Sequence, residues 1–222
     1  MGRDDGKYKG EYAALLVRRA RYDIIEHGRF WLSENPDEPG SIAWDAATTR
    51  ICTWARLTDR RNGRVLRVYN THLDYKSQLA REKAVELILL HAAEGLSAEP
   101  TIIMGDFNAG ESNPAMESLL SARIADLGGS PATPSDSPAL FTDTFRAVHP
   151  KAELVGTYHS WTGERSGEKI DHIFSTCELR AIDAEILHDR RDGRFPSDHF
   201  PVRATLEWND SMKEQAAVTS LP

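Results

Sequence analysis

Alternating apolar and polar residues dominate the first part of the chain, and helical spacing follows them. The alternation predicts paired strands at residues 12–18 and 22–26, and a second pair at 51–58 and 65–71. Asn62 and Gly63 in the turn DRRNGR favour a tight hairpin, because both residue types adopt positive φ at low cost. Over residues 77–94 the apolar spacing becomes that of a helix, with Ser77 as its N-cap and Gly95 at its end.

The second half of the chain predicts a strand at 101–104 and then a short helix that Asn113 caps and Pro114 opens. The segment GGSPATPSDSP predicts a surface loop over residues 128–138. Three more strands are predicted at 170–175, 181–187 and 200–208. Hairpins beside a strand-helix-strand unit indicate an α/β (α+β) fold in which two mixed β-sheets stack with helices outside. We expect one domain over residues 1–208 and a frayed tail over 209–222.

Composition places the chain among ordinary globular proteins. Of its 222 residues 40% are hydrophobic and 27% charged, and no stretch is long and apolar enough for a membrane span. The net charge of -7 argues against capture of nucleic acid by charge alone. Cys52 and Cys177 both lie in apolar segments, which predicts two buried free thiols rather than a disulfide or a zinc site. A reducing, cytoplasmic location is therefore expected.

Four polar clusters stand at the ends of predicted strands, where sheet enzymes place their reactive groups. The clusters are NTHLD at 70–74, GDFN at 105–108, IDHI at 170–173 and SDH at 197–199. Asp106 and Asn108 are two residues apart and so share a face, although each cluster by itself could equally be a turn or a cap. Asp171 sits in an otherwise apolar strand, where a carboxylate needs a partner, and a histidine would serve.

The chemistry of these side chains favours a metal over a nucleophilic serine. Ser197, Asp198 and His199 are adjacent, so they cannot align as a catalytic triad, and no G-x-S-x-G motif occurs. Carboxylates, an amide and imidazoles without a thiolate cluster suit a hard cation such as Mg²⁺ or Mn²⁺. Such a cation beside an Asp-His pair is suited to attack of water on a phosphoester.

The motifs NTHLD, GDFNAG, KIDHIFS and FPSDHFPV resemble, in order and spacing, those of the endonuclease/exonuclease/phosphatase superfamily. The segment GRDDGKYKGEY resembles a bacterial branch of that superfamily whose substrate is unknown. The resemblance covers nearly the whole chain and implies a four-layer α/β/β/α sandwich.

The resemblance also implies a role for each motif. Asp106 would orient the attacking water, and Asn108 would hydrogen-bond a phosphoryl oxygen. His199 would act as general base or phosphate clamp, held in its tautomer by Asp171. The implied metal ligands are Asp106, Asn108, Asp198 and His199.

On the leaving-group side, His72 would stabilise the phosphate or protonate the leaving oxygen. Glu11 resembles the carboxylate that polarises this histidine in deoxyribonuclease-like members.

The chain departs from the superfamily pattern at its start. The first Asn motif and the Glu that usually binds the metal are both missing. Three explanations are open: the sequence is truncated, it is a non-catalytic remnant, or Glu34 or Asp45 compensates. Truncation is the interpretation we favour, and it predicts weak stability and weak activity.

Three functions compete at this point. The acidic charge favours a hydrolase acting on a small or lipid-like phosphorylated substrate, with Tyr158, Trp161 and Arg194 as candidate substrate contacts. A nuclease is the second possibility, and its candidate contacts to nucleic acid are Arg60, Arg61, Arg64, Arg190, Arg191 and Arg194. A binding protein that kept the fold without its metal is the third.

Overall fold

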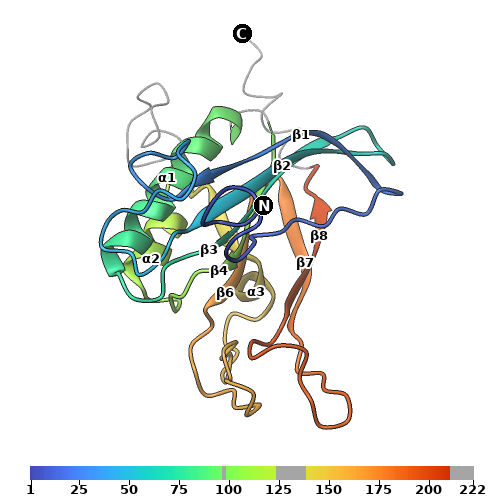
Figure 1. The fold of residues 1–222 in the computed structure, drawn as a ribbon. Coiled ribbons are helices and arrows are strands. Elements are labelled where there is room, and N and C mark those ends of the chain that lie inside the picture. Colours follow the sequence, from blue (N-terminus) through green and yellow to red (C-terminus); the bar gives the residue numbers. More distant parts are fainter. Residues whose placement is uncertain (97–98, 124–138, 211–222) are drawn as a thin grey trace.

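The computed structural model describes residues 1–96, 99–123 and 139–210. Its main sheet has six strands in the order β1-β2-β3-β4-β6-β5 (Figure 1). Their bounds are β1 Tyr22–Trp31, β2 Ile51–Asp59, β3 Val65–His72, β4 Thr101–Asp106, β5 Phe141–Asp143 and β6 Asp171–Thr176. The strands β3 and β4 are parallel, and the other neighbours are antiparallel. The parallel pair is joined by α1 (Gln78–Leu96), as a crossover connection requires.

Each face of the main sheet is covered by a different layer. The helices α1 and α2 (Pro114–Ser121) pack their apolar side chains on one face, against residues such as Tyr69, Ile103 and Phe174. A two-stranded antiparallel sheet of β7 (Leu179–Ile186) and β8 (Val202–Trp208) lies beside the main sheet (Figure 1). Trp208 of β8 packs against the opposite, β2–β3 face. The predicted sandwich of two sheets with flanking helices is confirmed, although of the described sheets only the larger is mixed.

Local sequence patterns predicted several elements correctly. The strands β2 and β3 form the predicted hairpin, in which Gly63 has a φ of 70° and its N–H donates to the Asp59 carbonyl. The side chain of Asn113 accepts a hydrogen bond from the Ala115 N–H at 3.0 Å, so it caps α2 as predicted. Ser77 likewise accepts from the Ala80 N–H at the start of α1.

The prediction of a strand at 12–18 is wrong. Leu15 and Val17 do pack on the apolar side chains of β2 and β3, so the alternation correctly reports which side chains are buried. The backbone nevertheless forms no ladder with the described residues, and the Ala14 carbonyl instead accepts a hydrogen bond from the Asn70 side chain. The strand predicted at 22–26 is longer than expected, and its partner is β2.

Further differences are local. The sequence patterns did not predict β5 or the short helix α3 (Thr144–Val148), which follows β5 directly. Helix α1 continues through Gly95 to Leu96. Cys52 is buried as predicted, but Cys177 is exposed in the turn between β6 and β7, so the prediction of two buried thiols is half wrong. The predicted loop at 128–138 and residues 211–222 of the predicted tail lie outside the described residues.

Among the described helices, none combines the length and apolar character that a membrane crossing needs.

Candidate active site

Three of the predicted site residues form a row across adjacent strands. His72 at the end of β3 pairs in register with Asp106 at the end of β4, and Asp106 pairs with Asp171 at the start of β6. The row exists because β3 and β4 are parallel and end at one edge, where the antiparallel β6 begins. We call His72, Asp106 and Asp171, which the sequence predicts to be catalytic, the catalytic row.

His199 joins the row from the segment before β8. An isolated bridge to Tyr158 places it there, and its Nδ1 lies 2.8 Å from Asp171 Oδ2. Its other nitrogen, Nε2, lies 3.9 Å from Asp106 Oδ2. The hydrogen bond with Asp171 raises the pKa of His199 above its usual value, although burial opposes the shift. Asp171 thus has the histidine partner that its position in an apolar strand required.

Asp106 carries an unfavourable charge at neutral pH. Burial, and then repulsion by Asp171, raise the pKa of the Asp106 carboxyl to about 6. Its side chain is 16% exposed, so solvent screens this repulsion only in part. A bound cation is the simplest way to stabilise both carboxylates in their charged form.

His72 lies between two carboxylates. Its Nδ1 is 3.5 Å from Glu11 Oε2, and its Nε2 is 3.2 Å from Asp106 Oδ2. Burial, and then the positive charge of Arg50, lower the pKa of His72 to about 4. A neutral imidazole has one N–H, so His72 can donate to only one of these carboxylates at a time.

Asn108 is held in a constrained conformation directly after β4. Its φ is 48°, its N–H donates to Asp106 Oδ1 at 2.8 Å, and its side-chain Nδ2 donates to the Leu73 carbonyl at 2.9 Å. A primary amide has two N–H donors, so this hydrogen bond uses only one of them. The motif GDFN therefore forms a turn that bonds its own backbone, and its role at a phosphate stays a prediction.

A candidate metal site is formed by Asp106, Asp171 and His199. Their ligand atoms lie within 4.8 Å of one another, and the described residues contain no second group of this kind. Two carboxylates and an imidazole are donors that Mg²⁺, Mn²⁺ and similar cations accept. Asp171 can offer Oδ1 to a cation while Oδ2 accepts from His199.

This group differs from the predicted ligand set. Asn108 directs its amide to Leu73, and Asp198 Oδ1 accepts from the Ser197 hydroxyl at 3.3 Å. Asp198 does not belong to the group, whereas Asp171, predicted only to orient His199, does. Glu34 and Asp45 are exposed and also lie outside it, so the group gives no support to compensation by either of them.

Sequence reasoning missed Arg50. Its side chain is 5% exposed, lies 4.0 Å from Glu11 and 3.8 Å from Asp74, and its Nε and Nη1 form no hydrogen bond with the described residues. Arg3 contacts the same Glu11 at 2.5 Å. Both arginines place positive charge beside His72. A lone Arg before an apolar strand gives no signal of this, because the contact depends on a residue 39 positions earlier in the chain.

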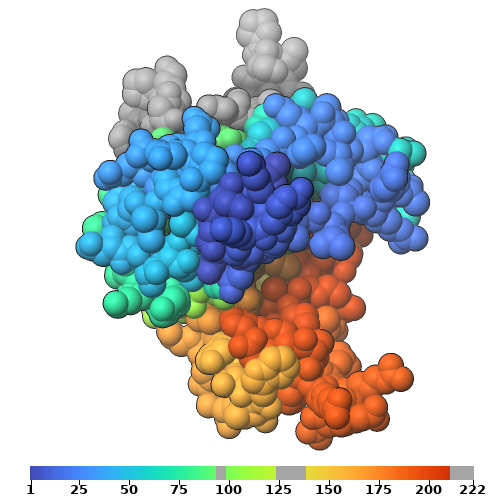
Figure 2. All heavy atoms as spheres, viewed as in Figure 1, coloured from blue at the N-terminus to red at the C-terminus, as the bar shows by residue number. Residues whose placement is uncertain are grey.

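The predicted substrate contacts lie on loops that project from the body of the protein. In Figure 2 these loops, in yellow-orange and orange, lie below the dark blue N-terminal segment that carries Glu11. The ring of Tyr158 is 5.0 Å from the His199 ring and half exposed, so it forms a wall of the site. Trp161 is 60% exposed, and Arg194 is exposed on the 189–196 loop.

Solved structures share this fold. An endonuclease/exonuclease/phosphatase from Bacteroides vulgatus is 31% identical with a TM-score of 0.80, over 94% of this chain and 74% of that one. A mannosyl-6-phosphatase from Bacteroides thetaiotaomicron is 31% identical with a TM-score of 0.76, over 93% of this chain and 75% of that one. The D. rerio TDP2 bound to a single-strand DNA product is 17% identical with a TM-score of 0.60, over 86% of this chain and 70% of that one, and so shows the fold alone.

A comparison with curated proteins finds no match. The model of the Endonuclease/Exonuclease/phosphatase family matches residues 12–199, which include the catalytic row and His199. With the two 31% identical structures, this match shows that the chain belongs to the Endonuclease/Exonuclease/phosphatase family.

Proposed function

We propose that this protein is a divalent-metal-dependent hydrolase that cleaves a phosphoester of a phosphorylated small molecule by attack of water. Membership of the family supports phosphoester hydrolysis. The observation that carries the proposal is the convergence of the catalytic row with His199, because a binding protein gains nothing from two carboxylates that repel each other at neutral pH. The same repulsion between the carboxylates makes a non-catalytic remnant of the fold the weaker alternative.

His199 and Asp106 act on the attacking water. Nδ1 of His199 is hydrogen-bonded to Asp171, so Nε2 is the nitrogen that faces Asp106 and the reacting groups. His199 accepts the proton of the water through Nε2, and Asp106 orients that water. The free N–H of the Asn108 amide donates to a phosphoryl oxygen as its charge increases.

His72 acts on the opposite side of the phosphate. Because burial lowers its pKa to about 4, His72 is neutral at pH 7 and donates an N–H hydrogen bond rather than a full proton. Glu11 and Arg50 lie beside it and fix its environment. Of the two roles that the sequence left open for His72, the low pKa supports stabilisation of the phosphate.

The metal would be held by the carboxylates of Asp106 and Asp171, with Asn108 and Asp198 as the predicted additional ligands. His199 was also predicted as a ligand, but Asp171 already bonds its Nδ1 and its Nε2 serves as the base. We propose Mg²⁺ or Mn²⁺, because the donors are oxygen-rich and include no thiolate. A divalent cation bound there neutralises charge on the phosphoryl oxygens and makes water more acidic.

A sugar phosphate is the substrate class that we favour. The mannosyl-6-phosphatase similar to this chain acts on a phosphorylated sugar by its name, and the net charge of -7 suits a small substrate better than a polyanion. We place the organic part of the substrate against Tyr158 and Trp161, where half-exposed rings offer an apolar surface. Arg194 would contact the phosphate. A lipid-like phosphate would use the same aromatic residues.

Hydrolysis of bis-p-nitrophenyl phosphate in the presence of Mg²⁺ or Mn²⁺ tests the reaction. We expect activity that EDTA abolishes, and a loss of roughly 10²-fold or more in kcat for Asp106→Ala and for His199→Ala. Asp183→Ala, on exposed β7, is the matched control and should keep its activity. A folded wild-type protein that hydrolyses neither this diester nor p-nitrophenyl phosphate with either metal would favour the binding remnant instead.

The nuclease alternative rests on Arg190, Arg191 and Arg194, which are exposed on one loop that precedes His199 in the chain. If these three arginines gripped a nucleic acid backbone, affinity would fall roughly 40-fold between 50 and 200 mM salt. For a sugar phosphate we expect kcat/KM to change only about twofold over that range. Measuring both substrates across the salt series separates the two functions, and a steep slope with faster cleavage of DNA or RNA would establish the nuclease.

A further inference from the structure

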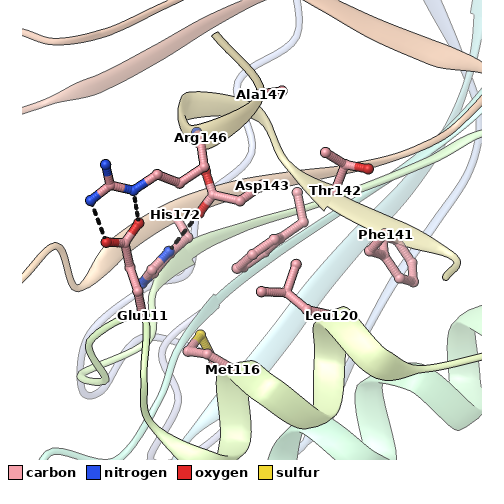
Figure 3. A pocket seen from close by; sticks show the side chains of 10 residues that line it. Glu111, Met116, Leu120, Phe141, Thr142, Asp143, Arg146, Ala147 and His172 are labelled. Carbon is pink, nitrogen blue, oxygen red and sulfur yellow. Dashed lines mark hydrogen bonds and ion pairs between the residues drawn. The ribbon is translucent and has the colours of Figure 1, made fainter. Parts of the chain in front are cut away.

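A cavity of about 460 Å³ lies behind the catalytic row, on the face of the sheet that the helices cover (Figure 3). Apolar side chains of α2, β5 and β6 line most of it. Its polar end is formed by Glu111, Asp143, Arg146 and His172, and Lys169 is buried beside them. His172 is the neighbour of Asp171 in β6 and points to the opposite face, so these groups touch the back of the strand that carries the active site.

The charges at this end are paired with one another. Arg146 donates to both oxygens of Glu111, at 2.7 and 2.6 Å (Figure 3). Lys169, 1% exposed, donates to Asp143 Oδ2 at 2.6 Å and lies 3.4 Å from Glu111. Buried ion pairs of this kind often stabilise a fold no better than apolar side chains of the same size, so stability alone is a weak reason for the network.

The contacts of His172 fix its tautomer. Its Nε2 lies 3.0 Å from the Ala109 carbonyl oxygen, which can only accept, so Nε2 carries the proton. Its Nδ1 lies 2.7 Å from the Lys169 ammonium, which can only donate, so Nδ1 accepts. Nδ1 is also 3.2 Å from Asp143 Oδ2. A proton on Nδ1 would nevertheless clash with the N–H groups of the Lys169 ammonium, which is nearer at 2.7 Å. The Lys169 ammonium, itself bonded to Asp143, therefore leaves the N–H of His172 on Nε2, directed at Ala109.

Ala109 belongs to the loop that shapes the phosphate site. It follows Asn108, whose positive φ is unfavourable for an L residue and must be held by its surroundings. Asn108 binds Leu73 and Asp106, Glu111 binds Arg146, and the hydrogen bond from His172 to Ala109 holds the segment between them.

We propose that His172, oriented by Lys169 and Asp143, is a positioning residue of the active site. Through the Ala109 carbonyl it holds the loop in which Asn108 presents its amide and Asp106 its carboxylate to the phosphate. The inference rests on the proposed function for its kinetic effect, but the hydrogen bond to the loop can be tested without any activity.

His172→Phe and His172→Gln separate positioning from packing. Phe keeps the ring against Phe107 and Phe174, whereas Gln loses the ring and keeps a side-chain N–H for Ala109. We expect Phe to lower kcat by roughly 10- to 100-fold, because small misplacements of catalytic groups are costly, with KM within about twofold. Gln should recover most of kcat although it is the less stable variant. If His172 served only to pack the core, the order would be reversed, and the more stable Phe variant would be the more active one.

His91→Phe is the matched control. His91 lies on α1, and its ring also packs on aromatic side chains, those of Phe30 and Tyr69. It should lower stability and leave kcat unchanged.

Hydrogen exchange of the Asn108 N–H, measured by NMR, gives the second readout. This N–H donates to Asp106 Oδ1, and we expect it to exchange roughly tenfold faster in His172→Phe than in wild type or His91→Phe. Unchanged exchange together with unchanged kcat overturns the proposal. If wild type hydrolyses no phosphoester, the proposed function fails, and the exchange rates alone decide whether His172 positions the loop.

Discussion

Asp106→Asn is expected to abolish hydrolysis and at the same time to make the metal-free protein more stable at neutral pH. Activity is lost because the amide neither binds a cation as a carboxylate does nor orients water in the same way. Stability rises because the charge of Asp106 is disfavoured in the fold by burial and by Asp171.

The sign and size of the stability change follow from linkage. Folding raises the pKa of Asp106 from 3.8 to about 6, so the folded protein binds the extra proton and loses stability as pH rises through this interval. Above pH 6 the penalty amounts to at most about 3 kcal/mol, and the neutral amide of the Asp106→Asn variant is free of it. The gain of Asp106→Asn over wild type should therefore be full at pH 7 and disappear near pH 4.

Urea denaturation in EDTA at pH 4, 5, 6 and 7 measures this gain. Asp59→Asn is the contrasting control, because a hydrogen bond from Arg21 lowers the pKa of Asp59, and its loss should destabilise the protein most at neutral pH. Excess Mg²⁺ should stabilise wild type and not Asp106→Asn, since only wild type binds it well. If Asp106→Asn is no more stable than wild type at pH 7, burial and Asp171 do not disfavour the charge of Asp106 as described.

Asp171→Asn has the second large effect that we expect, a loss of roughly 10³- to 10⁴-fold in kcat, by analogy with the loss of the orienting Asp in serine proteases. An amide at this position can present its N–H to His199 Nδ1, which would put the imidazole proton on Nε2. Nε2 could then no longer accept a proton from water. The Asn side chain keeps the size of Asp, so the fold should survive the change.

The same variant should move the pH profile. Asp171 raises the pKa of His199, and His199 must be neutral to act as a base, so the rate of wild type should rise with pH through a value above 6.5. Without that carboxylate the pKa falls, and the residual activity should begin to rise at lower pH. Rates from pH 5 to 9 for wild type, Asp171→Asn and the exposed control Asp183→Asn test this. A rising limb that stays in place in Asp171→Asn would show that another group is the base.

Local patterns were enough to predict many elements of the fold. The turn at Gly63 and the cap at Asn113 depend on neighbours in the chain, so the sequence identified both. The strand at 12–18 failed because alternation reports which side chains are buried, whereas a strand also needs a partner for its backbone. Strand β5 and helix α3 were missed because elements of three and five residues carry too few positions for a period to emerge.

By itself the sequence determined which side chains could carry the chemistry, because GDFN, IDHI and SDH each place polar groups at the end of an apolar run. Only the tertiary structure decided how these groups meet. Strand register aligns His72, Asp106 and Asp171, and a bridge to Tyr158 brings in His199 rather than the carboxylate of Asp198. Register and loop closure join residues that lie up to 127 positions apart in the sequence (from 72 to 199), and over such separations local propensity carries no information about which atoms come within a few ångströms of one another.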